Sequence, residues 1–411
     1  MQKASRLKDP PSLSLEEARR AILAHVAPLA GQRIPLARAL GRVAARSLKS
    51  TSPKPSFDQS TRDGYCLADI PAEFAEYPEI SLPLAGEIAA GDRGGDELLP
   101  GQAFRIMTGA PVPRGCSRVL PFEVCREQEG RVVLPAAELR RREKFIRRRG
   151  SDLAAGRVLV RKGQVLAADH LLMLVENGYA SVEVYRRPAV EVLCTGSELV
   201  SPGGRPGAGQ KISGNGILLS ALVATMGGTC SGTAAVPDQV DELVAVLGER
   251  IAARPQMIIT TGGMGPGKFD LVQEVFARLG GRTIYSRLRM RPGRSTLFGL
   301  VDDIPFFGLP GPPPAVRLLF HELVAPALRR LAGMRRPVPP AVPARLQGEI
   351  RLARAGRLNL KAGVARLERG QLVARVAGRT DAVNAILLLA ANRKHFRTGD
   401  RVMVHLLAQG L

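Results

Sequence analysis

The pattern of hydrophobic and polar positions near the N-terminus predicts an amphipathic helix. Ser14 and Glu17 have the spacing of a capping box, in which each residue satisfies a backbone N–H of the other. Apolar residues then recur on one helical face: Ala18, Ile22, Leu23 and Val26. A second helical pattern covers residues 35–46.

From residue 52 to residue 149 the apolar stretches become short and are interrupted by Pro and Gly. This pattern predicts a small β domain. The segment ends in a dense basic stretch at 139–149, which reads Leu-Arg-Arg-Arg-Glu-Lys-Phe-Ile-Arg-Arg-Arg. Two interpretations of this stretch stay open, a solvated surface and a contact to an anion.

Strands and helices alternate from residue 189 onwards. Strands are expected at 190–194, 229–236, 256–261 and 304–307, and helices at 216–226, 238–252, 271–279 and 315–331, with Asp238 and Asp270 as N-caps. This alternation predicts a doubly wound domain, a mostly parallel sheet with helices on both faces, whose ligands bind beyond the carboxyl ends of the strands. Further on, the Pro-rich segment 337–343 predicts a stiff linker, and segments 372–376 and 402–406 predict a small C-terminal β domain.

Composition narrows the class of protein. A chain of 411 residues predicts about two to four domains. The net charge of +22 predicts an anionic partner, which charge alone leaves open between nucleic acid, anionic lipid and a phosphorylated metabolite. The aromatic content of 4%, the absence of Trp and the lack of Cys/His finger spacing disfavour a nucleic-acid module.

Cysteine usage and hydropathy indicate the compartment. The five cysteines are scattered and never have C-x-x-C spacing, so neither a disulfide framework nor a zinc knuckle is expected. No apolar run reaches the roughly 18 residues of a membrane helix. We therefore expect a cytoplasmic protein without a membrane segment.

Three glycine-rich loops directly follow apolar strands, at 195–199, 260–270 and 308–313. Glycine lets the backbone N–H groups approach an anion, and the helix that follows adds its positive N-terminal end. Tight strand-to-helix turns would produce the same pattern. Within the second loop, Lys268 can compensate ligand charge, and Asp270 is either an N-cap or a magnesium ligand.

A basic turn at 289–294, Arg-Met-Arg-Pro-Gly-Arg, lies between the last two loops. Its three guanidinium groups match a tetrahedral oxyanion, although a solvated turn is the competing interpretation.

The loops and the basic turn together resemble the molybdopterin molybdenumtransferase family, also known as MoeA and as the E domain of gephyrin. Segment 57–65, Phe-Asp-Gln-Ser-Thr-Arg-Asp-Gly-Tyr, is similar to the family's F-D-x-S-x-M-D-G-Y-A. Segment 105–115, Arg-Ile-Met-Thr-Gly-Ala-Pro-Val-Pro-Arg-Gly, is similar to R-I-M-T-G-A-P-V-P-x-G. Shorter matches follow in the family's order at 149–152, 195–199, 262–270, 291–295 and 308–313.

The resemblance implies an α/β multidomain fold and an elongated homodimer. Its parts would be a helical linker domain (1–51 and 150–187), a β domain (52–149), a molybdopterin-binding α/β domain similar to molybdopterin adenylyltransferase (188–335) and a C-terminal β barrel (336–411). It also implies a reaction in which molybdate replaces the adenylate of adenylated molybdopterin, AMP leaves and Mg²⁺ assists. The molybdopterin adenylyltransferase is then an implied partner.

The resemblance also assigns roles to residues. Catalytic roles fall on Asp58, Asp63, Thr108 and Asp238, with Ser60 in the same motif as the first two. Asp270 would hold magnesium. Binding of the molybdopterin substrate and of molybdate falls on Thr195, Gly196, Glu198, Asn215, Gly262, Gly263, Gly265, Arg291, Arg294, Pro310 and Gly311.

This chain departs from the family pattern at several of these motifs. Arg291 and Arg294 replace lysines, and Arg62 replaces a methionine. The remaining departures remove polar or acidic groups: Ser151 and Ser197 stand at acidic positions, and Pro312 and Ala315 stand where the family has Asn and Ser. Two hypotheses follow, an active insertase and a non-catalytic molybdopterin-binding paralogue that carries the cofactor. A third, a basic scaffold or nucleic-acid binder, is favoured only by the net charge.

Overall fold

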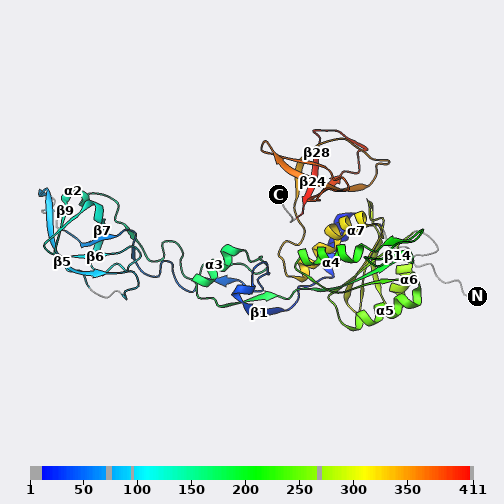
Figure 1. The fold of residues 1–411 in the computed structure, drawn as a ribbon, viewed down its shortest axis with the longest axis horizontal. Helices are drawn as coiled ribbons and strands as arrows, with labels where there is room; N and C mark the ends of the chain where they lie inside the picture. The colour runs from blue at the N-terminus through cyan, green and yellow to red at the C-terminus, as the bar shows by residue number, and fades with distance from the viewer. Residues whose placement is uncertain (1–11, 71–75, 94–96, 266–270, 408–411) are drawn as a thin grey trace, which may run out of the picture. The chain divides into compact units, whose positions relative to one another are not determined.

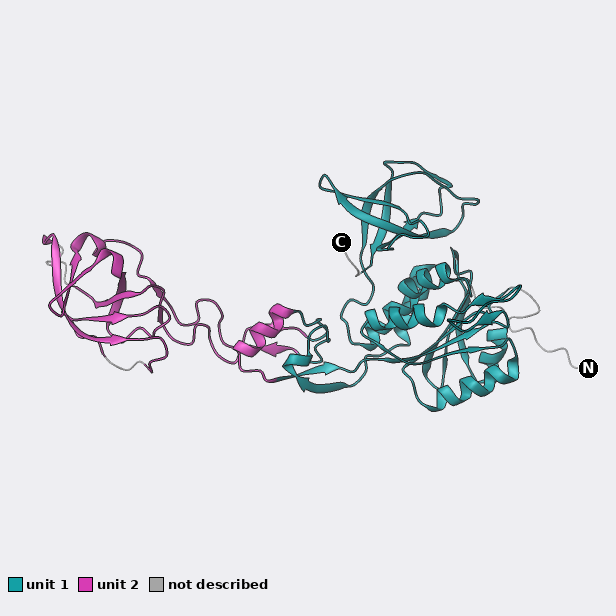
Figure 2. Ribbon diagram, viewed as in Figure 1, with its two compact units in different colours: residues 1–46, 162–167, 181–411 teal, residues 47–161, 168–180 magenta. Residues whose placement is uncertain are grey.

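The computed structural model describes residues 12–70, 76–93, 97–265 and 271–407. The chain forms two compact units (Figure 2). Unit 1 comprises residues 1–46, 162–167 and 181–411, and unit 2 comprises residues 47–161 and 168–180. No helix among the described residues is long and apolar enough to cross a membrane.

The N-terminal helix of unit 1 begins as its capping box predicts. Helix α1 (Leu15–Ala24) starts after Ser14, whose Oγ accepts the Glu17 N–H at 3.3 Å, while the Glu17 carboxylate accepts the Ser14 N–H at 2.7 Å. Its apolar face packs into the core of the α/β domain through Leu15, Ala18 and Ile22.

The prediction of a second helix at 35–46 is wrong. Only Leu36–Arg38 form a short 3₁₀ turn, and Gly41 then adopts a positive φ of 71°. Val43 and Ala44 pair instead with Val165 and Val184 in isolated β-bridges. These long-range backbone partners compete with helical hydrogen bonds and were not visible in the local pattern.

The central sheet of unit 1 has the order β16-β13-β17-β21-β20-β18. The first four strands are parallel, as expected, whereas β20 and β18 are antiparallel additions at one edge that the alternation did not predict. The antiparallel pairing of β20 with β21 follows from the turn between them. Asp302 and Asp303 both have positive φ and form a two-residue hairpin turn. The strands are β13 (Ala189–Thr195), β16 (Thr229–Val236), β17 (Met257–Thr261), β18 (Arg282–Arg287), β20 (Ser295–Val301) and β21 (Ile304–Leu309).

Helices cover both faces of this sheet, which confirms the doubly wound architecture (Figure 1). Successive side chains of a strand point to opposite faces, so Val192 packs into the cluster under α1, α4 and α7, and Leu193 packs into the cluster under α5 and α6. The expected helix at 315–331 is interrupted by a π-helical turn at Phe320–Val324. The helices are α4 (Asn215–Thr225), α5 (Val240–Ala252), α6 (Leu271–Arg278), α7 (Pro313–Leu319) and α8 (Ala325–Leu331).

The C-terminal part of unit 1 is a closed barrel of five strands. Its order is β24-β25-β22-β28-β26, and β26 pairs back onto β24. The prediction of a linker at 337–343 is partly wrong, because residues 341–343 form the start of β22. In this strand Pro343 lies opposite Met403 of β28. The strands are β22 (Ala341–Leu346), β24 (Leu358–Glu368), β25 (Gln371–Val376), β26 (Ala385–Leu389) and β28 (Arg401–Leu406).

Unit 2 contains the small β domain that the Pro- and Gly-rich pattern predicts. Its sheet has the order β7-β4-β6-β5-β9-β8, and its two hydrophobic clusters contain Leu67 and Phe104, respectively. Helix α3 (Ala168–Glu176) and the paired strands β2 (Leu48–Lys49) and β11 (Val158–Val160) also belong to this unit. The sheet strands are β4 (Gly64–Ala68), β5 (Glu79–Ile88), β6 (Ala103–Ile106), β7 (Cys116–Pro121), β8 (Arg126–Gln128) and β9 (Arg131–Pro135).

Candidate functional site

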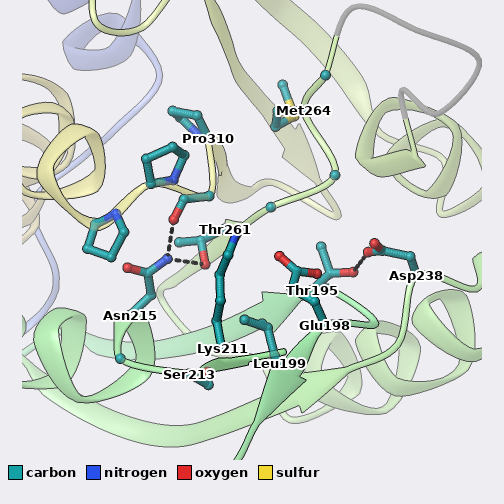
Figure 3. Close-up of a pocket in the computed structure, with 18 of the residues that line it drawn as sticks. Thr195, Glu198, Leu199, Lys211, Ser213, Asn215, Asp238, Thr261, Met264 and Pro310 are labelled. Atoms are coloured by element: carbon teal, nitrogen blue, oxygen red, sulfur yellow. Dashed lines mark hydrogen bonds between the residues drawn. The ribbon is translucent and has the colours of Figure 1, made fainter. Parts of the chain in front are cut away.

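A cavity of about 550 Å³ lies at the carboxyl ends of the parallel strands (Figure 3). The loops after β13, β17 and β21 and the N-terminal end of α4 all line it, so the three predicted loops converge. The described residues assigned to this region by sequence are all in its lining: Thr195, Gly196, Glu198, Asn215, Asp238, Gly262, Gly263, Gly265, Pro310 and Gly311. Lys268 and Asp270 lie outside the described residues.

Two consecutive glycines shape the floor of this cavity. Gly262 and Gly263 have φ values of 99° and 59°, a region that side-chain-bearing residues rarely adopt. A Cβ at Gly262 would lie 2.1 Å from the carbonyl oxygen of Thr195. The absence of a side chain therefore lets the loop after β17 pass directly against the end of β13.

Asn215, the first residue of α4, holds two of the loops together. Its side-chain amide donates to Thr261 Oγ1 at 3.2 Å and to the carbonyl oxygen of Gly311 at 2.8 Å. Its Oδ1 is buried without a partner among the described residues. The N-cap, Gly214, offers no side-chain hydrogen bond, so no side chain covers the first N–H groups of this helix.

Asp238 does not cap α5, which corrects the prediction for this residue. The helix begins at Val240 after Gln239 as N-cap. The Asp238 carboxylate instead accepts a hydrogen bond from the Thr195 hydroxyl, and its N–H donates to Ser197 Oγ at 3.2 Å. Ser197 therefore joins two loops at the rim of the cavity without contributing the charge of the acidic residue that the family pattern has there.

Lys211 is a cavity residue that the sequence analysis missed. The short parallel strands β14 (Leu199–Val200) and β15 (Lys211–Ile212) place it beside the first loop, where its N–H donates to the carbonyl oxygen of Glu198 at 2.8 Å. Its side chain extends into the cavity between Asn215 and Glu198 (Figure 3). The local sequence is a Gly/Pro-rich loop, and only the pairing of the two strands shows where the lysine points.

A second cavity, of about 660 Å³, contains the predicted arginine turn. Strand β19 (Met290–Arg291) pairs with β24, which sets Arg291 opposite Asn359 of the barrel. Gly293 permits the tight turn, because a Cβ there would lie 2.6 Å from Leu319 Cδ2. The lining contains six cationic residues and no carboxylate: Arg291, Arg294, Arg351, Arg354, Arg357 and Lys361.

The four barrel cations in this cavity were also missed by the sequence analysis. They follow the arginine turn by some tens of residues in the chain, and only the strand pairing between β19 and β24 brings them to it. No local motif marks them.

The remaining predicted residues lie in unit 2 and are hydrogen-bonded within it. Asp58 accepts from the Arg149 N–H at 2.7 Å and from the Arg148 guanidinium at 2.5 Å. Partial burial opposes ionisation of Asp58, but these two donors outweigh it and lower its pKa. Asp63 accepts the Thr108 N–H at 2.7 Å, which lowers the pKa of that carboxyl.

Two serines in the family motifs of unit 2, Ser60 and Ser151, form hydrogen bonds with neighbouring residues. Ser60 is buried, and its hydroxyl donates to the carbonyl oxygen of Arg62 at 2.5 Å. Ser151 hydrogen-bonds the neighbouring Asp152 carboxylate at 3.1 Å. The Arg148 contact to Asp58 also shows that part of the basic stretch is bonded within the domain.

Comparison with known families finds two matches that together cover most of the chain. A model of the MoeA N-terminal region, domains I and II, matches residues 13–178. A model described as a probable molybdopterin binding domain matches residues 191–330, which include every lining residue of the first cavity.

Known proteins match over most of their own lengths. Molybdopterin molybdenumtransferase 2 of Mycobacterium tuberculosis is 34% identical over 314 residues, covering 75% of this chain and 76% of that protein. The molybdopterin molybdenumtransferase of Staphylococcus epidermidis is 27% identical over 405 residues, covering 95% of each. A crystal structure of the MoeA protein of Pyrococcus horikoshii, 26% identical, matches with a TM-score of 0.81 over 96% of this chain and 99% of that chain. The chain therefore belongs to the molybdopterin molybdenumtransferase family of molybdenum cofactor biosynthesis.

Proposed function

We propose that this protein inserts molybdate into adenylated molybdopterin and releases AMP. The observation that carries the proposal is the convergence of the three glycine loops and the start of α4 on one cavity. Backbone N–H groups at a helix N-terminus and in glycine loops bind phosphate oxygens well. The cavity therefore offers the features that a phosphorylated pterin adenylate requires.

Different residues of the first cavity contact different parts of the substrate. The loop at Gly262 and Gly263 and the uncapped N–H groups of α4 face the phosphates. The unpaired Asn215 Oδ1 accepts an N–H of the bound ligand, which removes the cost of a buried acceptor without a partner. The Thr195–Asp238 hydrogen bond and the Ser197 contact hold the rim in place.

The second cavity is the proposed molybdate site. Guanidinium groups present paired donors that match a tetrahedral oxyanion, and Arg291 and Arg294 supply them from the turn. The barrel adds Arg351, Arg354 and Lys361, so the cavity concentrates positive charge from two parts of unit 1. Arginine at the turn keeps the charge of the family's lysines while widening the donor group.

Magnesium enters the proposal only through Asp270, the position that the family resemblance assigns to it, which lies outside the described residues. The described residues contain no group of three His, Cys, Asp or Glu side chains that could hold a metal ion. The described carboxylates of the first cavity therefore do not fit a magnesium site on their own.

The remaining assignments are proposals supported by family membership. They are catalytic roles for Asp58, Asp63 and Thr108, the four-domain division, a homodimer, a molybdopterin adenylyltransferase partner and a cytoplasmic location. The hydrogen bonds that lower the pKa values of Asp58 and Asp63 stabilise the ionised form of both carboxylates.

Release of AMP tests the proposed activity. Purified protein incubated with adenylated molybdopterin, molybdate and Mg²⁺ should release AMP, measured by chromatography. Asn215→Leu should reduce the release, because it removes both donor contacts that join α4 to the loops. Arg366→Ala, a change at an exposed barrel arginine outside both cavities, is the control.

Two results would count against the insertase. Absence of AMP release by the unsubstituted protein would contradict it. Retention of the pterin without turnover would identify the carrier instead, and the variants Ser151→Glu and Ser197→Asp would then show whether the missing carboxylates explain the inactivity.

A further inference from the structure

We propose that Lys211 is a substrate-binding residue of the first cavity, where its ammonium group binds the substrate's diphosphate and compensates its charge even when no divalent cation is bound. This inference rests on the proposed function, because the diphosphate belongs to the adenylated substrate. It goes beyond that function by assigning the cation of the phosphate site to this chain's own residue.

The backbone around Lys211 determines where its side chain points. Strand β15 pairs in parallel with β14, so Lys211 lies opposite Leu199, and the Ser213 N–H donates to the carbonyl oxygen of Val200 at 2.8 Å. The Lys211 N–H is bonded to Glu198 on the same ladder. These bonds hold the residue at the rim, and its side chain enters the space between Asn215 and Glu198 (Figure 3).

The ammonium group of Lys211 is available to an anion. In the described part of the chain it forms no ion pair, although many other cations of this protein do. Lysine is a compact point charge with three donors on a flexible stem, which suits phosphate oxygens. The cavity it enters is also where the α4 N-terminus and the Gly262–Gly263 backbone present N–H groups.

The carboxylates in the described lining do not form a competing metal site. They are Glu198 and Asp238, and Asp238 accepts a hydrogen bond from Thr195. Ser197 is neutral, and the described residues contain no cluster that could hold a metal ion. A magnesium ion needs several oxygen ligands, usually carboxylates and phosphate oxygens, whereas a lysine needs only the phosphate.

If the Lys211 ammonium group binds the diphosphate, the affinity for a nucleotide diphosphate should depend only weakly on Mg²⁺. ADP is a suitable probe because it contains adenosine and a diphosphate. The full-length protein is expected to bind ADP in excess EDTA nearly as well as with Mg²⁺, measured by titration calorimetry at constant ionic strength, which fixes the screening of surface charge.

Three variants separate the role of the ammonium group from general effects of charge. Lys211→Met keeps most of the side-chain length and should weaken ADP binding in EDTA by about tenfold or more, the usual effect of losing a charged hydrogen bond. Lys211→Arg should retain most of the affinity. Arg205→Met removes one charge from the same loop, outside the cavity lining, and should leave the affinity unchanged.

The outcomes distinguish this inference from the proposed function. ADP binding in EDTA that falls in Lys211→Met but not in Arg205→Met supports it. Equal affinity of Lys211→Met and the unsubstituted protein, or binding that requires Mg²⁺, overturns the role of Lys211 alone. Failure of the unsubstituted protein to bind ADP and adenylated molybdopterin under either condition overturns both.

Discussion

Gly262 shows how a single residue determines how closely the loop after β17 approaches the end of β13. Its φ of 99° and the 2.1 Å separation between a built Cβ and the Thr195 carbonyl oxygen exclude any side chain without movement of the backbone. Gly265 in the same loop has open space where a Cβ would lie and no positive φ. The backbone conformation of the loop therefore requires glycine at position 262 but not at position 265.

We predict that Gly262→Ala lowers the free energy of unfolding by more than about 1 kcal/mol, because alanine is strained at this φ and contacts the backbone of β13. ADP affinity should fall as well, since the loop must move away from the cavity. Thermal denaturation and calorimetric titration measure the two effects. Gly265→Ala is the matched control, and an equal loss in both variants would contradict the explanation.

His321, a buried residue of the π-helical turn between α7 and α8, makes the stability of the protein depend on pH. Burial lowers the pKa of His321 from its usual value of 6.5 to about 4, with Arg329 and Arg317 acting in the same direction and Glu322 opposing them. The folded protein therefore keeps His321 neutral at a pH where the unfolded chain binds a proton. Stability contributed by the neutral form is complete above pH 6.5 and is lost as the pH falls toward 4.

The loss associated with His321 should reach about 3 kcal/mol between these pH values. Denaturant unfolding at a series of pH values measures it. His321→Leu removes the titrating group, so the difference in stability between this variant and the unsubstituted protein should change with pH over that window. A difference that is independent of pH would contradict the prediction.

At the scale of elements, the π-helical turn between α7 and α8 connects three parts of unit 1. Glu322 in this turn accepts hydrogen bonds from Arg19 of α1 and, at 2.9 Å, from His405 of β28. Its backbone carbonyl also accepts from Arg19 Nε at 2.9 Å. All three side chains are buried, and removing one partner leaves a charge in a site without water.

We therefore predict that Glu322→Ala lowers the free energy of unfolding by about 3–5 kcal/mol, the range for breaking a buried ion pair. Asp241 of α5 forms an exposed ion pair with Arg278 of α6, so Asp241→Ala should change the free energy of unfolding little. Chemical denaturation of both variants makes the comparison. Similar small effects in both would show that Glu322 contributes no more than a surface pair.

At the scale of the whole molecule, the two compact units have separate hydrophobic cores. The clusters around Phe104 and Leu67 belong to unit 2, and those under the central sheet and in the barrel belong to unit 1. Cooperative unfolding follows shared cores. Unfolding is therefore not expected to be one two-state transition.

Differential scanning calorimetry should show more than one transition. ADP should raise the transition of unit 1 selectively, because the residues of the first cavity all belong to that unit and a ligand stabilises the folded state that binds it. Glu322→Ala should lower the same transition. A single transition with equal calorimetric and van't Hoff enthalpies would contradict separate unfolding.

The sequence by itself determined the features that depend on local periodicity and on glycine chemistry. The capping box at Ser14, the alternation that builds the central sheet and the three loops beyond β13, β17 and β21 were all predicted, because each is encoded within a few neighbouring residues. The resemblance to the family came from the same kind of signal, since its motifs are contiguous.

The tertiary structure decided what depends on pairing between distant segments. It replaced the expected helix at 35–46 by bridges to Val165 and Val184, added the antiparallel strands β18 and β20 and moved Asp238 from a helix cap to a contact with Thr195. Lys211 and the barrel arginines became cavity residues only through the ladders β14–β15 and β19–β24. The physical reason is the same in each case: a hydrogen bond or charge contact between residues far apart in the chain leaves no periodic trace in the sequence around either partner.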